Sequence, residues 1–109
     1  MTGNEYQDLA ARTINWEMGK YYMTFHAMFG LASEVGEIHG VVQKHYQGHP
    51  IDDGKVKEEL GDLLWFAAEL CTAYDWKIED VMKDNIEKLK KRYPDGFSEE
   101  RSVHRDRYE

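Results

Sequence analysis

The sequence predicts an all-α fold, a bundle of four helices. Apolar residues recur at helical spacing in four segments, and breaks rich in Gly, Pro or Asp separate these segments. No stretch of useful length alternates apolar and polar residues as a half-buried strand does. Because each helix must bury its apolar stripe against another, four such helices favour a bundle.

The first expected helix covers roughly residues 4–18. This segment contains neither Gly nor Pro, and Gly19 after it can end the helix. Residues 21–24 would then form a connection. The positions with mostly helical spacing are Tyr6, Leu9, Ala10, Thr13, Ile14 and Trp16.

The second expected helix runs from about residue 25 to residue 46, and residues 47–50 break it. Glycines inside a helix cost up to ~1 kcal/mol each relative to Ala, so those at 30, 36 and 40 need a packing reason. Gly36 stands between two acids and would let a neighbouring backbone or a bulky ligand approach. The expected inward side consists of Phe29, Leu31, Val35, Ile38, Val41 and Val42.

The third expected helix, about residues 53–74, has the strongest apolar pattern, and the turn at residues 52–54 can cap its start. Its apolar positions are Val56, Leu60, Leu63, Leu64, Ala67, Leu70 and Cys71.

The fourth expected helix covers about residues 78–92, and Pro94 with Gly96 ends it. Residues 1–94 then form the helical domain. Residues 95–109 form a charged, aperiodic tail, which would be mobile unless it docks on the domain or on a neighbouring subunit. The apolar positions of this helix are Ile78, Val81, Met82, Ile86, Leu89 and Tyr93.

Length and composition limit the possible partners. A chain of 109 residues is one domain, too short for its helices to cover each other well, so a homo-oligomer is expected. Its 3 Trp, 7 Tyr and 4 Phe also favour burial at a subunit interface. The net charge of -7 argues against nucleic acid as a partner, but not against a nucleotide held through a cation.

The expected location is the cytoplasm. The single cysteine, Cys71, lies in an apolar run, so no internal disulfide can form and a buried thiol in a reducing compartment is expected. No run approaches the ~18 apolar residues of a membrane span, and the N-terminus lacks an apolar signal core. We therefore expect no membrane partner.

Two acidic pairs carry the chemistry. Glu34 with Glu37, and Glu59 with Asp62, are three residues apart, which places both acids of a pair on one side of a helix. The first acid of each pair shares its helix side with apolar residues at i+4 and i+7, so the acids are predicted to point inward. These apolar residues are Ile38 and Val41 after Glu34, and Leu63 and Phe66 after Glu59.

Inward carboxylates require a partner or a metal, because burying an unpaired charge is costly. Either pair alone would be read as a solvated helix face. Two inward pairs together favour a metal site, and oxygen ligands without Cys or His indicate a hard cation such as Mg²⁺ or Mn²⁺.

The fourth helix offers groups for an anionic ligand. Asn85, Lys88 and Arg92 follow i, i+3, i+7 spacing and share a face. An amide and two cations beside a carboxylate site suit a phosphate chain, which indicates phosphoryl chemistry. The alternatives are surface charge for Lys88 and Arg92 and a satisfied buried amide for Asn85.

Three segments together resemble the MazG family of all-α nucleoside triphosphate pyrophosphohydrolases, in its short single-domain and phage-type members. The family signature ExxE followed by ExxD is matched with 21 residues between Glu37 and Glu59. Tyr6-Gln7 and Thr13 extend the resemblance to nearly the whole chain. The segments are Gly30-Leu31-x-x-Glu34-x-Gly36-Glu37, Glu59-Leu-Gly-Asp62-Leu-Leu-Trp65 and Asn85-Ile-x-Lys88-Leu-x-x-Arg92-Tyr93-Pro94-x-Gly96-Phe97.

The resemblance implies Mg²⁺-dependent hydrolysis of a nucleoside triphosphate between its α and β phosphates, with Mn²⁺ as a substitute. The products would be the nucleoside monophosphate and pyrophosphate. Such a reaction would serve nucleotide-pool house-cleaning, the removal of noncanonical triphosphates, or would set the level of a deoxynucleotide. Family members are usually dimers or tetramers, so a homodimer or homotetramer is expected. Carried over by position, the resemblance implies that the metal ligands and catalytic acids are Glu34, Glu37, Glu59 and Asp62. One of the glutamates would engage the attacking water. The substrate-binding residues would be Asn85, Lys88 and Arg92.

The base pocket is less defined. Trp16 can stack on a nucleobase, or it can be a core or interface residue. The pocket walls are placed near Trp16, Tyr21, Tyr22 and Phe25.

Two other functions are compatible with a helical bundle that contains buried acids. A di-iron oxidase needs Glu-x-x-His pairs, and no Glu in this chain has a His three residues later. A catalytically silent helical module that binds nucleotide or metal stays the alternative to the enzyme.

Overall fold

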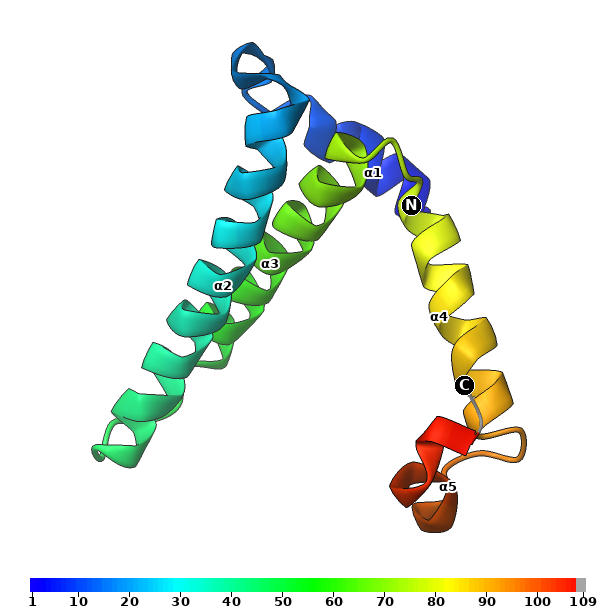
Figure 1. The fold of residues 1–109 in the computed structure, drawn as a ribbon. Coiled ribbons are helices and arrows are strands. Elements are labelled where there is room, and N and C mark those ends of the chain that lie inside the picture. Colours follow the sequence, from blue (N-terminus) through cyan, green and yellow to red (C-terminus); the bar gives the residue numbers. More distant parts are fainter. Residues whose placement is uncertain (108–109) are drawn as a thin grey trace. The chain divides into compact units, whose positions relative to one another are not determined.

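The computed structural model describes residues 1–107, and it is all-α as predicted (Figure 1). No strand occurs among these residues, and none of their helices is long and apolar enough to cross a membrane. The elements follow the order α1 (Gly3–Ala11), the 3₁₀ helix η1 (Trp16–Met18), α2 (Gly19–Tyr46), α3 (Asp53–Ala73), α4 (Ile78–Arg92), α5 (Glu99–Val103) and the 3₁₀ helix η2 (Arg105–Arg107).

The chain divides into two compact units, the first spanning Met1–Lys77 and the second beginning at Ile78. In the first unit, α2 and α3 form an antiparallel helical hairpin and lie side by side (Figure 1). Helix α1 packs on α3, and η1 packs on α2. The α2–α3 interface is therefore the main packing surface of this unit.

A small core lies where these elements meet. Met23 is fully buried and packs in one cluster with Ile14 and Ala73. The cluster continues to partly buried side chains on α1, η1 and α3, namely Ala11, Met18 and Trp65. Cys71 is a free, buried thiol as predicted, and its burial raises the pKa of that thiol.

The N-terminal part differs from the sequence prediction. The first helix ends at Ala11 rather than at residue 18, because local side-chain hydrogen bonds stabilise turns there. The Thr13 hydroxyl donates to the Ala10 carbonyl, and the Asn15 side chain accepts from the backbone of Glu17 and caps η1. Gly19, at φ 76°, begins α2 instead of ending α1, so the expected connection at residues 21–24 is wrong: it is helical.

The expected ends of the later helices agree with the structure within one residue. Helix α2 ends at Tyr46, and α4 covers Ile78–Arg92. Helix α3 begins at Asp53 because the Asp52 side chain accepts a hydrogen bond from the Lys55 backbone, as an N-cap does.

Several residues expected on the inward side are exposed in the single chain. Phe29 is 71% exposed, and Val35, Leu60 and Leu64 are also exposed. The buried residues of α2 are Met23, Ala27 and Gly30. The expected stripe is wrong at Phe29 and Val35, whereas its other members, Leu31, Ile38, Val41 and Val42, are partly buried.

Gly30, and not Gly36, is the glycine that allows a close approach. A Cβ at Gly30 would lie 2.2 Å from the Phe66 ring of α3, a separation that packed atoms do not adopt. A Cβ at Gly36 would meet nothing within 4 Å among the described residues. Of the three glycines for which a packing reason was expected, only Gly30 has one among the described residues, and the close approach expected at Gly36 is not found.

We expect Gly30→Ala to lower the free energy of unfolding by about 1–3 kcal/mol, because the new methyl group would displace Phe66. Gly36→Ala is the matched control in the same helix, and it should raise that free energy by up to ~1 kcal/mol through helix propensity. Urea unfolding of both variants measures the difference. Equal stability of the two variants would contradict the packing of Phe66 on Gly30.

The second unit contains α4 and the C-terminal segment. Residues 95–107 include α5, where a mobile, aperiodic tail was expected. The Ser98 side chain caps α5, and the Arg101 guanidinium donates to the backbone carbonyls of Lys91 and Arg92. These bonds tie the segment to the end of α4, and docking of this kind is what the sequence prediction required for an ordered tail. The domain division at residue 94 stays a prediction.

Candidate metal centre

Three of the predicted acids meet across the α2–α3 interface. Glu34 comes from α2, and Glu59 and Asp62 come from α3. One carboxylate oxygen from each lies within 4.8 Å of the others. The antiparallel pairing of α2 and α3 brings three of the four predicted acids into one cluster, which we call the carboxylate cluster.

The members of the carboxylate cluster differ in burial. Glu59 is 5% exposed, Glu34 is half-buried and Asp62 is exposed. The Oε2 atom of Glu34 is buried and has no hydrogen-bond partner. A buried carboxylate oxygen without a donor is costly, so this atom indicates a position for a positive ligand.

Lys55 compensates part of the negative charge. Its Nζ lies 2.9 Å from Oε1 of Glu59, one turn along α3. The hydrogen bond to Glu59 and the neighbouring carboxylates raise the pKa of Lys55. The sequence reasoning missed Lys55, although its i, i+4 spacing to Glu59 was a visible signal.

The carboxylates perturb one another. A hydrogen bond with Glu59, partial burial and the neighbouring negative charges raise the pKa of Glu34 to about 7. The same hydrogen bond, together with the one from Lys55, lowers the pKa of Glu59. Of the two acids, Glu34 therefore binds a proton first as the pH falls, as expected when like charges share a site.

These residues fit a hard divalent cation. All donors are carboxylate oxygens, which Mg²⁺ and Mn²⁺ prefer, and the unpartnered Glu34 Oε2 supplies an open ligand atom. A bound cation would replace both the Glu34 proton and the compensation from Lys55. Glu34, Glu59 and Asp62 are the residues that would hold it.

Comparison with known families bears on these residues directly. The family model of the MazG nucleotide pyrophosphohydrolase domain matches residues 25–97, which is more than half of the chain and includes all four predicted acids. The chain belongs to the MazG family. No curated protein and no solved structure matches it.

The fourth predicted ligand of this MazG chain, Glu37, lies outside the carboxylate cluster. Glu37 is exposed, one turn beyond Glu34 on α2, and its charge contributes to the raised pKa of Glu34. Glu37 is therefore close to the carboxylate cluster, but it is not among the acids whose oxygens lie within 4.8 Å of one another. Its role as a metal ligand stays a prediction.

The predicted substrate residues on α4 belong to the second unit. Asn85 and Lys88 are exposed, and Arg92 is buried. Lys88 lines a cavity of ≈ 460 Å³ together with Asp84, Glu87 and Lys91. Trp16, the predicted stacking residue, is exposed, and its indole nitrogen donates to the Ala11 carbonyl at 3.0 Å. Their contacts with substrate stay predictions.

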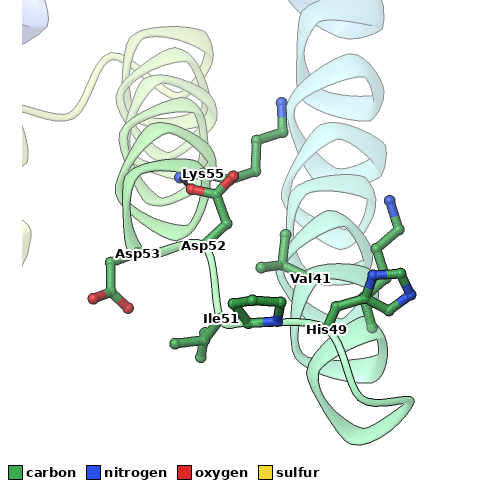
Figure 2. A pocket seen from close by; sticks show the side chains of 8 residues that line it. Val41, His49, Ile51, Asp52, Asp53 and Lys55 are labelled. Carbon is green, nitrogen blue, oxygen red and sulfur yellow. Dashed lines mark hydrogen bonds between the residues drawn. The ribbon is translucent and has the colours of Figure 1, made fainter.

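A pocket lies at the end of the α2–α3 hairpin (Figure 2). Its volume is ≈ 500 Å³. Lys55 lines this pocket and also contacts Glu59, so it connects the pocket with the acids. The lining residues are Val41, Lys44, His49, Pro50, Ile51, Asp52, Asp53 and Lys55.

The raised pKa of Glu34 predicts how stability depends on pH. Between the unfolded value of 4.5 and the folded value of about 7, the folded chain binds more protons than the unfolded chain. The Glu34 contribution to stability is therefore complete below pH 4.5 and is lost as the pH rises through 7. The lowered pKa of Glu59 acts only below its unfolded value of 4.5, outside this window.

Urea unfolding between pH 5 and pH 8 in EDTA measures this effect. As the pH rises from 5 to 8, the free energy of unfolding should fall less for Glu34→Gln than for the parent chain, because the amide does not titrate. Saturating Mg²⁺ should remove the difference in slope, since it screens the repulsion that ionised Glu34 experiences. Parallel profiles for the two proteins in EDTA would contradict the assigned proton on Glu34.

Proposed function

We propose that this MazG chain is a metal-dependent nucleoside triphosphate pyrophosphohydrolase. Water attacks the α-phosphorus, the bond from that phosphorus to the bridging oxygen of the β-phosphate breaks, and the products are the monophosphate and pyrophosphate. The observation that carries the proposal is the carboxylate cluster, with its oxygens within 4.8 Å, inside a chain of this family.

The residues of the carboxylate cluster would hold Mg²⁺, with Mn²⁺ as a substitute. When bound, the cation supplies charge neutralisation and polarises phosphate oxygens. Glu34, Glu59 and Asp62 would hold it between α2 and α3. The rigid pairing of the helices keeps these ligands in position, which reduces the reorganisation needed at the moment of reaction.

Glu37 is suited to the attacking water. It is a carboxylate beside the carboxylate cluster but not part of it, and it is exposed, so a water molecule can reach it. In this role Glu37 accepts the proton that the water loses as its oxygen bonds to the α-phosphorus.

Lys55 is suited to the leaving group. Once a cation neutralises Glu59, the Lys55 ammonium is available to phosphate oxygens, and it already lines the pocket at the hairpin end. Lys44 lines the same pocket. Two ammonium groups there can stabilise the charge that develops on pyrophosphate, because charged hydrogen bonds to phosphate are strong.

A homodimer or homotetramer is part of the proposal. A band of large apolar side chains on the N-terminal half of α2 is exposed in the single chain, more than a monomer of this size commonly presents. A second copy would bury it, which size-exclusion chromatography with light scattering can test. The band consists of Tyr21, Tyr22, Phe25, Met28 and Phe29.

The test of the proposed function is pyrophosphate release from a panel of ribo-, deoxyribo- and modified nucleoside triphosphates. We expect release from some members in Mg²⁺ and none in EDTA. Nucleotide binding without release in any member, by folded and metal-loaded protein, would instead support a silent binding module.

A further inference from the structure

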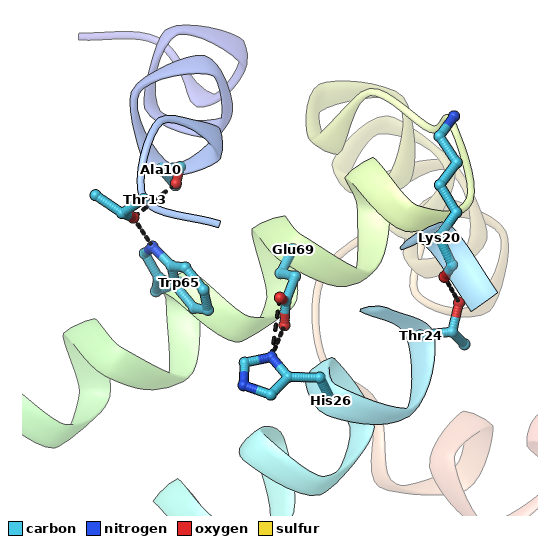
Figure 3. Close-up of polar contacts among 7 residues, drawn as sticks. All are labelled: Ala10, Thr13, Lys20, Thr24, His26, Trp65 and Glu69. Atoms are coloured by element: carbon cyan, nitrogen blue, oxygen red, sulfur yellow. Dashed lines mark hydrogen bonds and ion pairs between the residues drawn. The ribbon is translucent and has the colours of Figure 1, made fainter. Parts of the chain in front are cut away.

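Helix α3 contains a buried carboxylate that the proposed mechanism does not use. The Glu69 side chain is 0% exposed, and His26 of α2 is its one ion-pair partner among residues 1–107. Both Glu69 oxygens accept from Nδ1 of His26, at 2.8 Å and 2.9 Å (Figure 3). A buried ion pair is often no more stabilising than apolar residues of the same volume, so stability alone does not explain this pair.

Glu69 fixes the ring of His26 and leaves its other nitrogen available. Because Nδ1 carries the proton that Glu69 accepts, only Nε2 can bond to a further group. The His26 side chain is 48% exposed, and Nε2 has no partner among the described residues. Nε2 accepts a hydrogen bond when the imidazole is neutral and donates one when it is protonated.

Two aromatic rings of α3 lie beside His26. Its ring centroid lies 5.6 Å from that of Phe66 and 6.4 Å from that of Trp65. The Trp65 indole is itself held, because its nitrogen donates to the Thr13 hydroxyl at 2.8 Å (Figure 3). Oriented aromatic faces beside one unpaired nitrogen suit a planar heterocycle, which can stack and form a hydrogen bond at the same time.

The His26–Glu69 pair lies on the same helix faces as the carboxylate cluster. His26 precedes Glu34 by eight residues on α2, roughly 12 Å along a helix that rises 1.5 Å per residue. On α3, Glu69 follows Asp62 by seven residues, which returns to the same face. This separation is too long for contact with the α-phosphorus, but the base of an extended nucleotide can reach it.

We propose that His26, positioned by Glu69, recognises the nucleobase of the substrate. Nε2 of His26 bonds to the hydrogen-bonding edge of the base, and Trp65 and Phe66 supply the aromatic surface beside it. The inference rests on the proposed function, because it takes the ligand to be a nucleotide. It places the base beside Trp65 and Phe66 of α3 and the terminal phosphates toward Lys55.

Binding of nucleoside monophosphates in EDTA tests this inference without turnover. With each monophosphate at millimolar concentration, we expect one base or a subset to shift the imidazole NMR signals of His26. His26→Ala should weaken binding of the preferred monophosphate at least tenfold. Glu69→Gln should keep most of the affinity, since its amide oxygen can still accept from Nδ1. His39→Ala, which replaces another exposed histidine of α2, is the matched control and should change nothing.

Selectivity among triphosphates separates the inference from the proposed function. If His26 reads the base, His26→Ala changes the ratios of kcat/KM between bases and mainly raises KM. An equal change for every base, or His26 signals that stay fixed while a nucleotide binds, would overturn the inference and leave pyrophosphate release standing. Binding that depends on His26 without turnover would overturn the proposed function alone.

Discussion

Replacing Glu59 with Gln is expected to lower kcat/KM for pyrophosphate release by about 10³-fold, comparable to removing one preorganised electrostatic group from an active site. Glu59 is the central member of the carboxylate cluster: it is buried, shares a hydrogen bond with Glu34 and contacts Lys55. The amide keeps the volume but not the charge, so cation affinity falls with activity. Steady-state kinetics and Mn²⁺ titration of the same preparation measure both effects.

Glu58→Gln is the matched control, because Glu58 is the neighbouring residue and is 65% exposed. It should keep both activity and Mn²⁺ binding. Asp62→Asn provides a second variant at an exposed position, in case Glu59→Gln does not fold. Full activity in both Glu59→Gln and Asp62→Asn would show that the carboxylate cluster is not the site.

Replacing Lys55 with Gln should have opposite effects on cation binding and on turnover. Removing the ammonium that contacts Glu59 at 2.9 Å removes a competitor of the cation, so Mn²⁺ affinity should rise. The kcat should fall by about 10- to 100-fold, since a hydrogen bond to a charged group contributes about 1.5–3 kcal/mol. Mn²⁺ titration and kcat at saturating substrate separate the two effects.

Lys57→Gln is the control for this prediction, as Lys57 is an exposed lysine in the same part of α3. It should change neither quantity. If Lys55→Gln kept the parent kcat, the role of Lys55 at the leaving group would be wrong, whatever happened to cation affinity.

The sequence predicted the helices whose ends are encoded locally. Helix α3 follows the capping Asp52, and α4 ends just before Pro94, so both ranges agreed with the structure. The N-terminal part could not be read in this way. Gly19 looks like a helix stop, but its positive φ allows the chain to pass directly from η1 into α2.

The site was predictable where it depended on periodicity and was missed where it depended on pairing between helices. The spacing predicted all four acids on inward faces, which is right for buried Glu59 and half-buried Glu34 and wrong for the exposed Glu37 and Asp62. The His26–Glu69 pair depends on the register of α2 against α3, which no local pattern encodes. The available signal was Glu69 itself, a lone acid within the apolar run of residues 63–71.

The aromatic residues of α2 show a different limit. Periodicity identifies an apolar face but not what covers it, and Phe29 is exposed although its spacing suggested an inward position. The small residue Gly30 faces α3 instead, because Phe66 needs the space.

Hydrolysis in ¹⁸O-labelled water tests the central claim most directly. With a triphosphate that is turned over in Mg²⁺, attack at the α-phosphorus places the label in the nucleoside monophosphate, and pyrophosphate is released unlabelled. We predict this distribution in Mg²⁺ and no hydrolysis in EDTA. Label in pyrophosphate, release of inorganic phosphate in its place, or equal turnover in EDTA would contradict the account.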